Sequence, residues 1–229
     1  METKRKIEFD SRFADRVKDY RTLVFEADVE NAPTSELQKE ELSKLAEEIV
    51  AKYEVSDINA IPAIAATRKA YKACGKDPNR YRPSQEQMMR RIVRGLGLYN
   101  VNALVDAGNE LSLKTGCSVG CFDADKVEGD VITLGIGEAG EPYEGIGRGE
   151  LNIEGLPVFR DNIGGIGSPT SDNVRTMLSL NTKRLFVTVH LFDASIDADE
   201  VVRLFNDIFS RWGTATNIRH SLYAPDKKC

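Results

Sequence analysis

The sequence predicts a single α+β domain in which helices flank a mixed, largely antiparallel sheet. Three observations lead to this class. Segments with one apolar helical face dominate residues 35–113, short strands separated by glycines follow in residues 118–159, and a long apolar strand precedes a last helix. With 229 residues, 41% of them hydrophobic, the chain can bury a substantial core. No stretch approaches the roughly 18 apolar residues that a membrane helix needs, so we expect no membrane partner.

The amino-terminal part of the chain predicts one strand and one helix. Residues 23–29 (Leu-Val-Phe-Glu-Ala-Asp-Val) have the composition of a strand. The Ser-x-x-Gln pattern at 35–38 is a capping box, and it opens a helix that extends to about Tyr53. We expect residues 1–57 to form an N-terminal extension that packs on a main body of residues 58–229, which includes the C-terminal helix.

Three further helices are predicted before the strands begin. One runs from about 61 to 73 and stops at Gly75, and a second starts at Pro83-Ser84. In this second helix the arginines are expected to face outward, opposite a buried stripe formed by Met88, Met89, Ile92, Val93 and Leu96. The third covers about residues 100–113.

Five strands and a last helix complete the prediction. The strands lie near 118–122, 131–134, 151–153, 158–159 and 185–192. The segment 185–192 is apolar on both faces, which predicts a central strand. Asp197 caps the last helix, whose apolar stripe of Val201, Leu204, Phe205, Ile208, Phe209 and Trp212 is assigned to the core.

Charge is distributed unevenly along the chain. Net charge is −5, yet residues 68–94 contain nine basic and two acidic residues, a local charge of +7. A basic face on an otherwise acidic protein is typical of a protein that binds a polyanion at one surface. The alternative is a solvated helix surface, and the sequence leaves both interpretations open.

Two polar blocks suggest a pocket for a small polar ligand. The first is residues 101–109 (Val-Asn-Ala-Leu-Val-Asp-Ala-Gly-Asn), and the second is residues 164–173 (Gly-Gly-Ile-Gly-Ser-Pro-Thr-Ser-Asp-Asn). Buried amides and carboxylates are costly unless they find partners. We therefore predict that the two blocks meet and that their polar groups hydrogen-bond a ligand.

Other motifs do not support a cofactor, a metal or a covalent nucleophile. Residues 135–140 match G-x-G-x-x-G, but no helix pattern follows, so a dinucleotide site is rejected. Cys117 and Cys121 lack ligand partners and are assigned as buried thiols, and His190 is assigned as a structural histidine. Scattered cysteines and the absence of an apolar signal region near the amino terminus predict a cytoplasmic protein.

A family resemblance rests on motifs in residues 60–195. Arg82-Pro83-Ser84 with Arg90-Arg91, the run from Tyr99 to Asn109, and Cys121-Phe122-Asp123 together resemble the editing module of the phenylalanyl-tRNA synthetase beta chain, its third and fourth domains. The Ser-Pro-Thr-Ser-Asp sequence at 168–172 is closer to freestanding relatives of that module. No synthetase catalytic core or ATP signature occurs in the sequence, so a complete ligase is excluded.

The resemblance implies a fold and a function. It implies the fold of the editing module for residues 58–229, and trans-acting hydrolysis of mischarged aminoacyl-tRNA by a positioned water. The alternative is a noncatalytic RNA- or amino-acid-binding protein. The implied partners are the aminoacylated 3′ end of tRNA and an amino acid, with no DNA, metal or cofactor. The implied catalytic residues are Asn109, Ser168 and Thr170; the substrate-binding residues are Asn102, Asp106, Gly164, Gly165 and Asp172; the tRNA-binding residues are Arg68, Lys72, Arg82, Arg90, Arg91 and Arg94.

One position departs from the family pattern. The family has a histidine where this chain has Gly120, directly before Cys121-Phe122-Asp123. The change removes a polar group from the implied pocket. It predicts either a different amino-acid specificity or a loss of catalysis, and the sequence does not name the amino acid or the tRNA.

Overall fold

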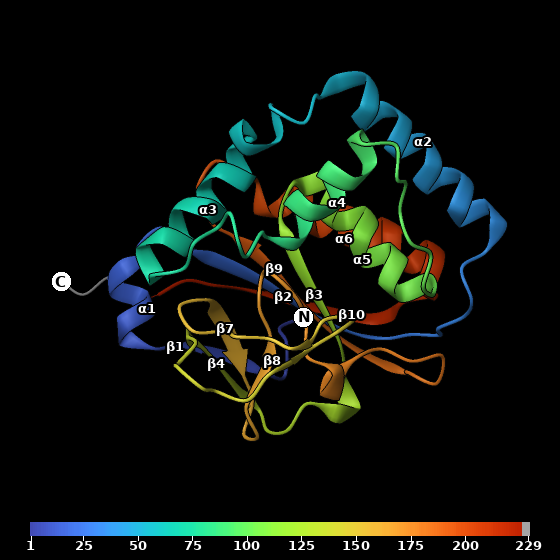
Figure 1. Cartoon of the computed structure of the whole chain (residues 1–229). Coiled ribbons are helices and arrows are strands. Elements are labelled where there is room, and N and C mark those ends of the chain that lie inside the picture. Colours follow the sequence, from blue (N-terminus) through green and yellow to red (C-terminus); the bar gives the residue numbers. More distant parts are fainter. Residues whose placement is uncertain (226–229) are drawn as a thin grey trace.

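The computed structural model describes residues 1–225 and has an α+β fold, as predicted (Figure 1). Its helices are α1 (Ser11–Arg16), α2 (Glu36–Lys52), α3 (Pro62–Cys74), α4 (Ser84–Val93), α5 (Ala103–Thr115) and α6 (Ala198–Gly213), with short 3₁₀ turns η1 (Ile58–Ala60), η2 (Ala124–Lys126) and η3 (Val174–Thr176). Figure 1 places α2 to α6 on one side of the strands. No helix within residues 1–225 is long and apolar enough to cross a membrane.

The strands divide between two four-stranded sheets and a small hairpin. The first sheet has the order β1 (Lys6–Phe9), β4 (Val131–Ile136), β7 (Pro157–Arg160), β8 (Gly165–Gly167). The second has the order β10 (Thr216–Tyr223), β2 (Arg21–Asp28), β9 (Arg184–Leu191), β3 (Ser118–Asp123). The hairpin pairs β5 (Glu144–Gly145) with β6 (Gly149–Glu150). Pairing is antiparallel except between β1 and β4, so the predicted mixed, largely antiparallel character is confirmed, although the sequence predicted one sheet rather than two.

The second sheet lies between two layers of the core. One of its faces packs against α5 and α6 through a cluster that includes Phe25, Val187 and Phe205. Its other face contributes Phe122 and Phe186 to a cluster shared with the first sheet. Strand β9 lies between β2 and β3, and all but its first residue are buried, which confirms the predicted central strand.

The helix boundaries follow from local capping. The Ser35 hydroxyl accepts a hydrogen bond from Gln38 N at the start of α2, as the capping box predicts. The Gln38 side chain does not complete the box, because its amide donates instead to Ala103 O at the start of α5. Helix α3 ends at Gly75, whose φ of 97° belongs to the left-handed region that favours glycine.

The predicted strand at residues 151–153 is wrong. This segment is irregular, and its alternating apolar residues Leu151 and Ile153 fill a small cluster with Tyr71 and Tyr143. Burial from a loop therefore produced the same two-residue period as a strand. The short elements β1, α1 and β8 and the long strand β10 were not predicted.

Residues 1–57 contribute two strands to the sheets. Strand β1 pairs with β4 in the first sheet, and β2 pairs with both β9 and β10 in the second. The division into an extension of residues 1–57 and a main body of residues 58–229 stays a prediction.

Candidate functional site

A cleft of about 570 Å³ opens where α4, α5, β3 and the loop after β8 converge. Its walls carry Asn109 and Ser112 from α5 and Val119 from β3. The loop of residues 168–172 forms a further wall, and the β5–β6 hairpin adds Ile146 and Arg148. The structure thus brings the two polar blocks of the sequence to one cleft.

Asn109 is the polar residue of the first block that lines the cleft, and Val101 of the same block lines it as well. It lies in the second turn of α5 and is half-buried. Its side-chain amide makes no hydrogen bond to any of residues 1–225, so both its donor and its acceptor are available to a ligand.

Asn102 and Asp106 have structural partners instead, and they do not line the cleft. The Asn102 side chain caps α5 by accepting from Val105 N at 3.0 Å. Asp106 accepts from Thr34 Oγ1 at 2.6 Å and from Val101 N at 3.2 Å, and burial raises its pKa. The expectation that these two polar groups lack partners in the protein is therefore wrong, because the amino-terminal segment and the helix end satisfy them.

Gly164 and Gly165 are also not among the residues that line the cleft. Gly164 N donates to Asp161 Oδ1, and its carbonyl accepts from Asp161 N in the turn before β8. A Cβ atom at Gly165 would lie 2.8 Å from the Tyr143 ring. Close packing, rather than ligand contact, accounts for glycine at position 165.

Ser168 lines the cleft, but its hydroxyl is used within its own loop. Ser168 Oγ donates to Ser171 O at 3.0 Å and accepts from the Thr170 and Ser171 amides at 3.3 Å. No base contacts this hydroxyl among the described residues. Ser168 therefore holds the shape of the loop, and its geometry is not that of an activated nucleophile.

Thr170 lies in the same wall of the cleft and is held by a hydrogen bond from the protein core. Its Oγ1 is 2.8 Å from the hydroxyl of Tyr71, a wholly buried residue of α3. Burial raises the pKa of Tyr71, so the phenol stays neutral. This contact connects the cleft wall to the core.

Asp172 is the acidic residue of the cleft. Its Oδ2 accepts from Cys121 N at 3.1 Å, and the residue is half-buried. Burial raises the pKa of Asp172 to about 8, because the Cys121 amide compensates only part of the lost hydration. A carboxyl with such a pKa exchanges its proton near neutral pH.

Gly120, which stands where the family has a histidine, does not face the cleft. A Cβ atom there would lie 2.7 Å from the Phe122 ring and 3.0 Å from Thr188 Oγ1. The position thus points into the packed space between the two sheets, and a larger side chain would need Phe122 to move.

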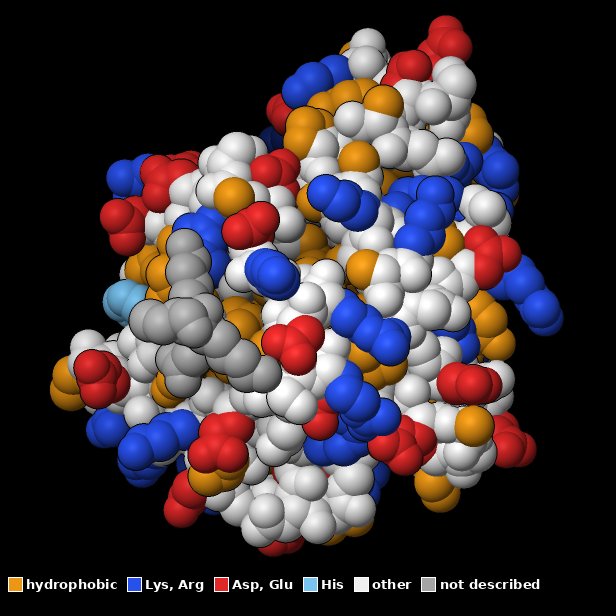
Figure 2. Space-filling model, turned by 90° about the vertical axis from the view of Figure 1, so that its left-hand side faces the viewer, with side chains coloured by type: hydrophobic (Ala, Val, Ile, Leu, Met, Phe, Trp, Pro, Cys, Tyr) orange, Lys and Arg blue, Asp and Glu red, His pale blue; other side chains and the backbone are white. Residues whose placement is uncertain are grey.

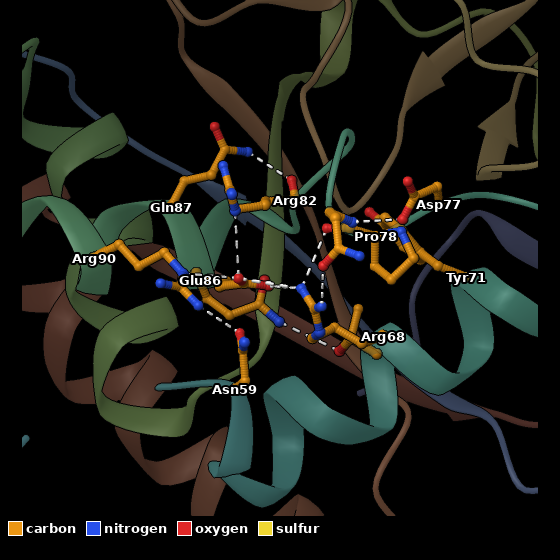
Figure 3. Close-up of polar contacts among 12 residues, drawn as sticks. Asn59, Arg68, Tyr71, Asp77, Pro78, Arg82, Glu86, Gln87 and Arg90 are labelled. Atoms are coloured by element: carbon orange, nitrogen blue, oxygen red, sulfur yellow. Dashed lines mark hydrogen bonds and ion pairs between the residues drawn. The ribbon is translucent and has the colours of Figure 1, made fainter. Parts of the chain in front are cut away.

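The basic segment is organised around one buried carboxylate. Glu86 of α4 has no exposed side-chain surface, and Arg68, Arg82 and Arg90 point toward it from different sides (Figure 3). The closest N–O distances from Glu86 are 2.9 Å to Arg68, 2.9 Å to Arg90 and 3.6 Å to Arg82. Arg90 also donates to Asn59, which ties α4 to η1. We call Glu86, Arg68, Arg82 and Arg90 the Glu86 cluster.

The Glu86 cluster corrects the expectation that the arginines of α4 all face outward. The side chain of Arg90 is 15% exposed and is held in an ion pair. Arg91 is half-buried and stacks on the Tyr99 ring, with its guanidinium carbon 3.8 Å from the ring centre. Arg94, directly after the helix, is the one of the three that is exposed. The amphipathic pattern identified Met89 and Ile92 as buried, but Leu96, predicted for the same stripe, lies after the helix and is 58% exposed. The pattern also could not reveal a buried acid within the polar face.

The rim of the cleft is nevertheless basic. Of the six basic residues predicted to bind tRNA, Arg82, Arg90, Arg91 and Arg94 line the cleft, whereas Arg68 and Lys72 do not. Sequence reasoning missed Arg148, an exposed residue of the β5–β6 hairpin that donates to Gln87 on α4. Its glycine-rich surroundings signalled a turn but gave no sign that the turn folds over α4.

Positive charge is also visible on the α1 and α3 side of the molecule (Figure 2). Figure 2 shows Lys and Arg side chains across the middle of the face on the α1 and α3 side, with Asp and Glu more frequent near its edges. Lys69 and Lys72 of α3 are both exposed.

His190, Cys117 and Cys121 do not line the cleft. His190 is buried among Tyr20, Phe159 and Phe192, and its Nδ1 hydrogen-bonds the Tyr20 hydroxyl at 2.8 Å. Burial lowers the pKa of His190 to about 3, so it is neutral. Cys117 is buried and Cys121 half-buried, and burial raises the pKa of both thiols. Cys229 lies outside the described residues.

Comparisons with known proteins place the chain in a family. The fold is similar to a crystal structure of an N-terminal fragment of the phenylalanyl-tRNA synthetase beta-subunit from Pyrococcus horikoshii, with a TM-score of 0.48 and 14% identity. The match covers 95% of this chain and 51% of that one, so the chain spans about half the length of the fragment. No curated protein matches. The family model described as the B3/4 domain matches residues 66–211, well over half of the sequence, and the chain therefore belongs to the B3/4 domain family.

Proposed function

We propose that this protein hydrolyses mischarged aminoacyl-tRNA in trans, in the cytoplasm, with water as the attacking species. One observation carries the proposal: a free amide, that of Asn109, and a basic rim that includes Arg94 and Arg148 belong to the same cleft. An aminoacyl ester joined to a polyanion needs both kinds of group. Membership of the B3/4 domain family and the resemblance of the 99–109 motif to the synthetase editing module support the same substrate.

The chemistry requires positioning rather than a covalent nucleophile. Water adds to the ester carbonyl carbon, and the acyl C–O bond to the ribose breaks. The ribose oxygen takes a proton as the free amino acid leaves. The Asn109 amide donates to the carbonyl oxygen as negative charge develops there, and the Thr170 hydroxyl, aligned by Tyr71, orients the water. Ser168 maintains the conformation of the 168–172 loop through its hydrogen bonds, and so keeps Thr170 in position.

The basic rim binds the tRNA backbone. Arg91, Arg94 and Arg148 carry no carboxylate partner among residues 1–225, so their charges are available to phosphates. Arg82 has the longest contact in the Glu86 cluster and is 47% exposed, so it can join them. Arg68 and Arg90 are held more tightly and serve chiefly to fix α4.

A panel of radiolabelled mischarged tRNAs tests the proposal directly. We expect loss of ester from at least one tRNA, faster than spontaneous hydrolysis, and a strong reduction in the Asn109→Ala variant. Arg203→Ala is the matched surface control, since Arg203 is an exposed arginine of α6 that does not line the cleft. Tight tRNA or amino-acid binding without ester loss across the panel would instead support a noncatalytic binding protein.

A further inference from the structure

Asp172 is an acidic residue in the wall of a cleft that is otherwise lined by basic charge. Five arginines line this cleft, and Asp172 is its only acidic lining residue, counted within residues 1–225. None of these arginines approaches the Asp172 carboxylate within the 4.0 Å of an ion pair. Asp172 and the arginines of the cleft are therefore not joined in an ion pair.

One oxygen of Asp172 is available to a ligand. Oδ2 is occupied by Cys121 N, and Oδ1 has no hydrogen-bond partner among the described residues. Oδ1 is also not among the fully enclosed unsatisfied atoms of the protein, although the residue as a whole is half-buried. Asp172 lines the cleft together with Ser168 and Thr170.

A carboxylate in this setting favours a cationic ligand group. Burial makes its charged form costly, and nothing within the described residues offsets that cost except one backbone amide. A positive group at Oδ1 would form a charge-assisted hydrogen bond and compensate the lost hydration. A ligand that fits the whole cleft therefore carries a cation near Asp172 and anions at the arginine rim.

We propose that Asp172 binds the α-ammonium group of the aminoacyl ester, so that the cleft selects a free amine carried on a polyanion. This inference rests on the proposed hydrolysis of aminoacyl-tRNA and identifies the substrate group that the cleft recognises. An aminoacylated nucleotide has its ammonium group two bonds from the ester carbon and its phosphates on the opposite side. That separation matches a cleft with its acid on one wall and its arginines along the rim.

The test compares pairs of ligands that differ only in the amine. A tRNA carrying an amino acid and the same tRNA carrying the N-acetylated amino acid are hydrolysed side by side by wild type, Asp172→Asn and Glu144→Gln. Glu144 is an exposed acid on the hairpin that bears Arg148, and it does not line the cleft, so its variant removes one negative charge nearby without touching the site.

We expect wild type to prefer the free amine by about 10- to 100-fold in kcat/KM, the range for one charge-assisted hydrogen bond. Asp172→Asn should lose that preference, chiefly through KM, and should leave the N-acetylated substrate within about threefold of wild type. Glu144→Gln should behave as wild type. Equal hydrolysis of both substrates by wild type, or equal slowing of both by Asp172→Asn, would overturn the assignment.

Binding separates this inference from the proposed function. An adenosine whose amino acid is attached by an amide rather than an ester cannot be hydrolysed in the same way, and its Kd can be compared with that of the N-acetylated form. A preference for the free amine that disappears in Asp172→Asn supports the assignment even if no tRNA is deacylated. Equal binding of the two analogues by wild type would overturn it while leaving hydrolysis intact.

Discussion

Asn109 and Thr170 face the same cleft but differ in how they are held. We predict that Asn109→Ala slows ester hydrolysis by about 10- to 1,000-fold, the range for losing one transition-state hydrogen bond, with little change in stability. Thr170→Ala should slow hydrolysis by a similar factor and also destabilise the protein by about 1–3 kcal/mol, because it leaves the buried Tyr71 hydroxyl without its partner. Single-turnover kinetics and thermal unfolding measure the two effects separately.

Tyr71→Phe is the control for Thr170. In the Tyr71→Phe background the further change to Thr170→Ala should cost less stability than it does alone, because no phenol is left unpaired. Ser168→Ala tests the covalent route: we expect no acyl-enzyme by mass spectrometry in wild type. An acyl-enzyme that disappears in Ser168→Ala would contradict attack by water, and full activity in all three cleft variants would place the site elsewhere.

The raised pKa of Asp172 determines the direction in which folding stability changes with pH. Its pKa is about 8 in the folded protein and near 4 when unfolded, so between these values the folded state keeps a proton that the unfolded state has lost. Folding stability therefore falls as pH rises from about 4 to 8, by at most about 1.4 kcal/mol per pH unit from this group. Cys121 and Tyr143 face the same carboxyl, and the pKa of each is itself raised, so both remain neutral there.

The comparison with Asp172→Asn isolates this effect. Asparagine removes the titration but can still accept from Cys121 N through its amide oxygen. We expect the stability advantage of Asp172→Asn over wild type to grow from pH 4 to pH 8, as measured by denaturant unfolding. Parallel pH profiles for the two proteins would contradict a raised pKa.

At the scale of the element, α4 is fixed by the Glu86 cluster rather than by its apolar face alone. We predict that Arg90→Glu destabilises the protein by about 3–5 kcal/mol, because it places a second negative charge beside a fully buried carboxylate. Arg94→Glu, at the exposed residue directly after α4, should change stability by no more than about 0.5 kcal/mol. Urea unfolding of the two variants gives the comparison, and equal effects would mean that the Glu86 cluster contributes nothing to stability.

Elements with strong local patterns were predictable from the sequence, and those defined by partners were not. Helices α2 and α3 follow from a capping serine and a terminating glycine, and β9 follows from its unbroken apolar run. Strand β10 was not predicted. It is an edge strand with little buried surface, so its residues lack the apolar and polar alternation that packing on a core imposes.

The candidate site was predictable only where its residues stand out from their neighbours in the sequence. Sequence reasoning found Asn109, Ser168, Thr170 and Asp172 because unusual polar residues stand out in an apolar segment or a glycine-rich loop. It also chose Asn102, although that side chain caps its own helix. Composition cannot distinguish a polar group that a distant segment satisfies from one left open for a ligand.

At the scale of the whole molecule, a net charge of −5 coexists with a basic cleft rim. An acidic body repels nucleic acid except where that rim can approach it, so the charge distribution orients the encounter. We predict that tRNA affinity falls with salt and that Arg94→Ala with Arg148→Ala reduces the slope of log K against log salt by about 2, one unit for each lost phosphate contact.

Arg203→Ala serves as the control for the salt experiment, since it removes one positive charge from an exposed position on α6 that does not line the cleft. Filter binding or fluorescence anisotropy over a salt series measures both slopes. An unchanged slope in the Arg94 and Arg148 double variant would mean that the rim is only a solvated surface.

The pairing of β2 limits how far the chain can be shortened before the fragment loses solubility. The family match covers residues 66–211 and includes β9, whereas β2 lies before it and β10 after it; β2 pairs along its full length with β9 and also pairs with β10. Cutting the chain to 66–211 would leave β9 as a long, apolar edge strand with unpaired amides, a template for intermolecular pairing. The shortened polypeptide should therefore aggregate on expression, because the solubility of the matched segment would depend on β2, which lies outside it.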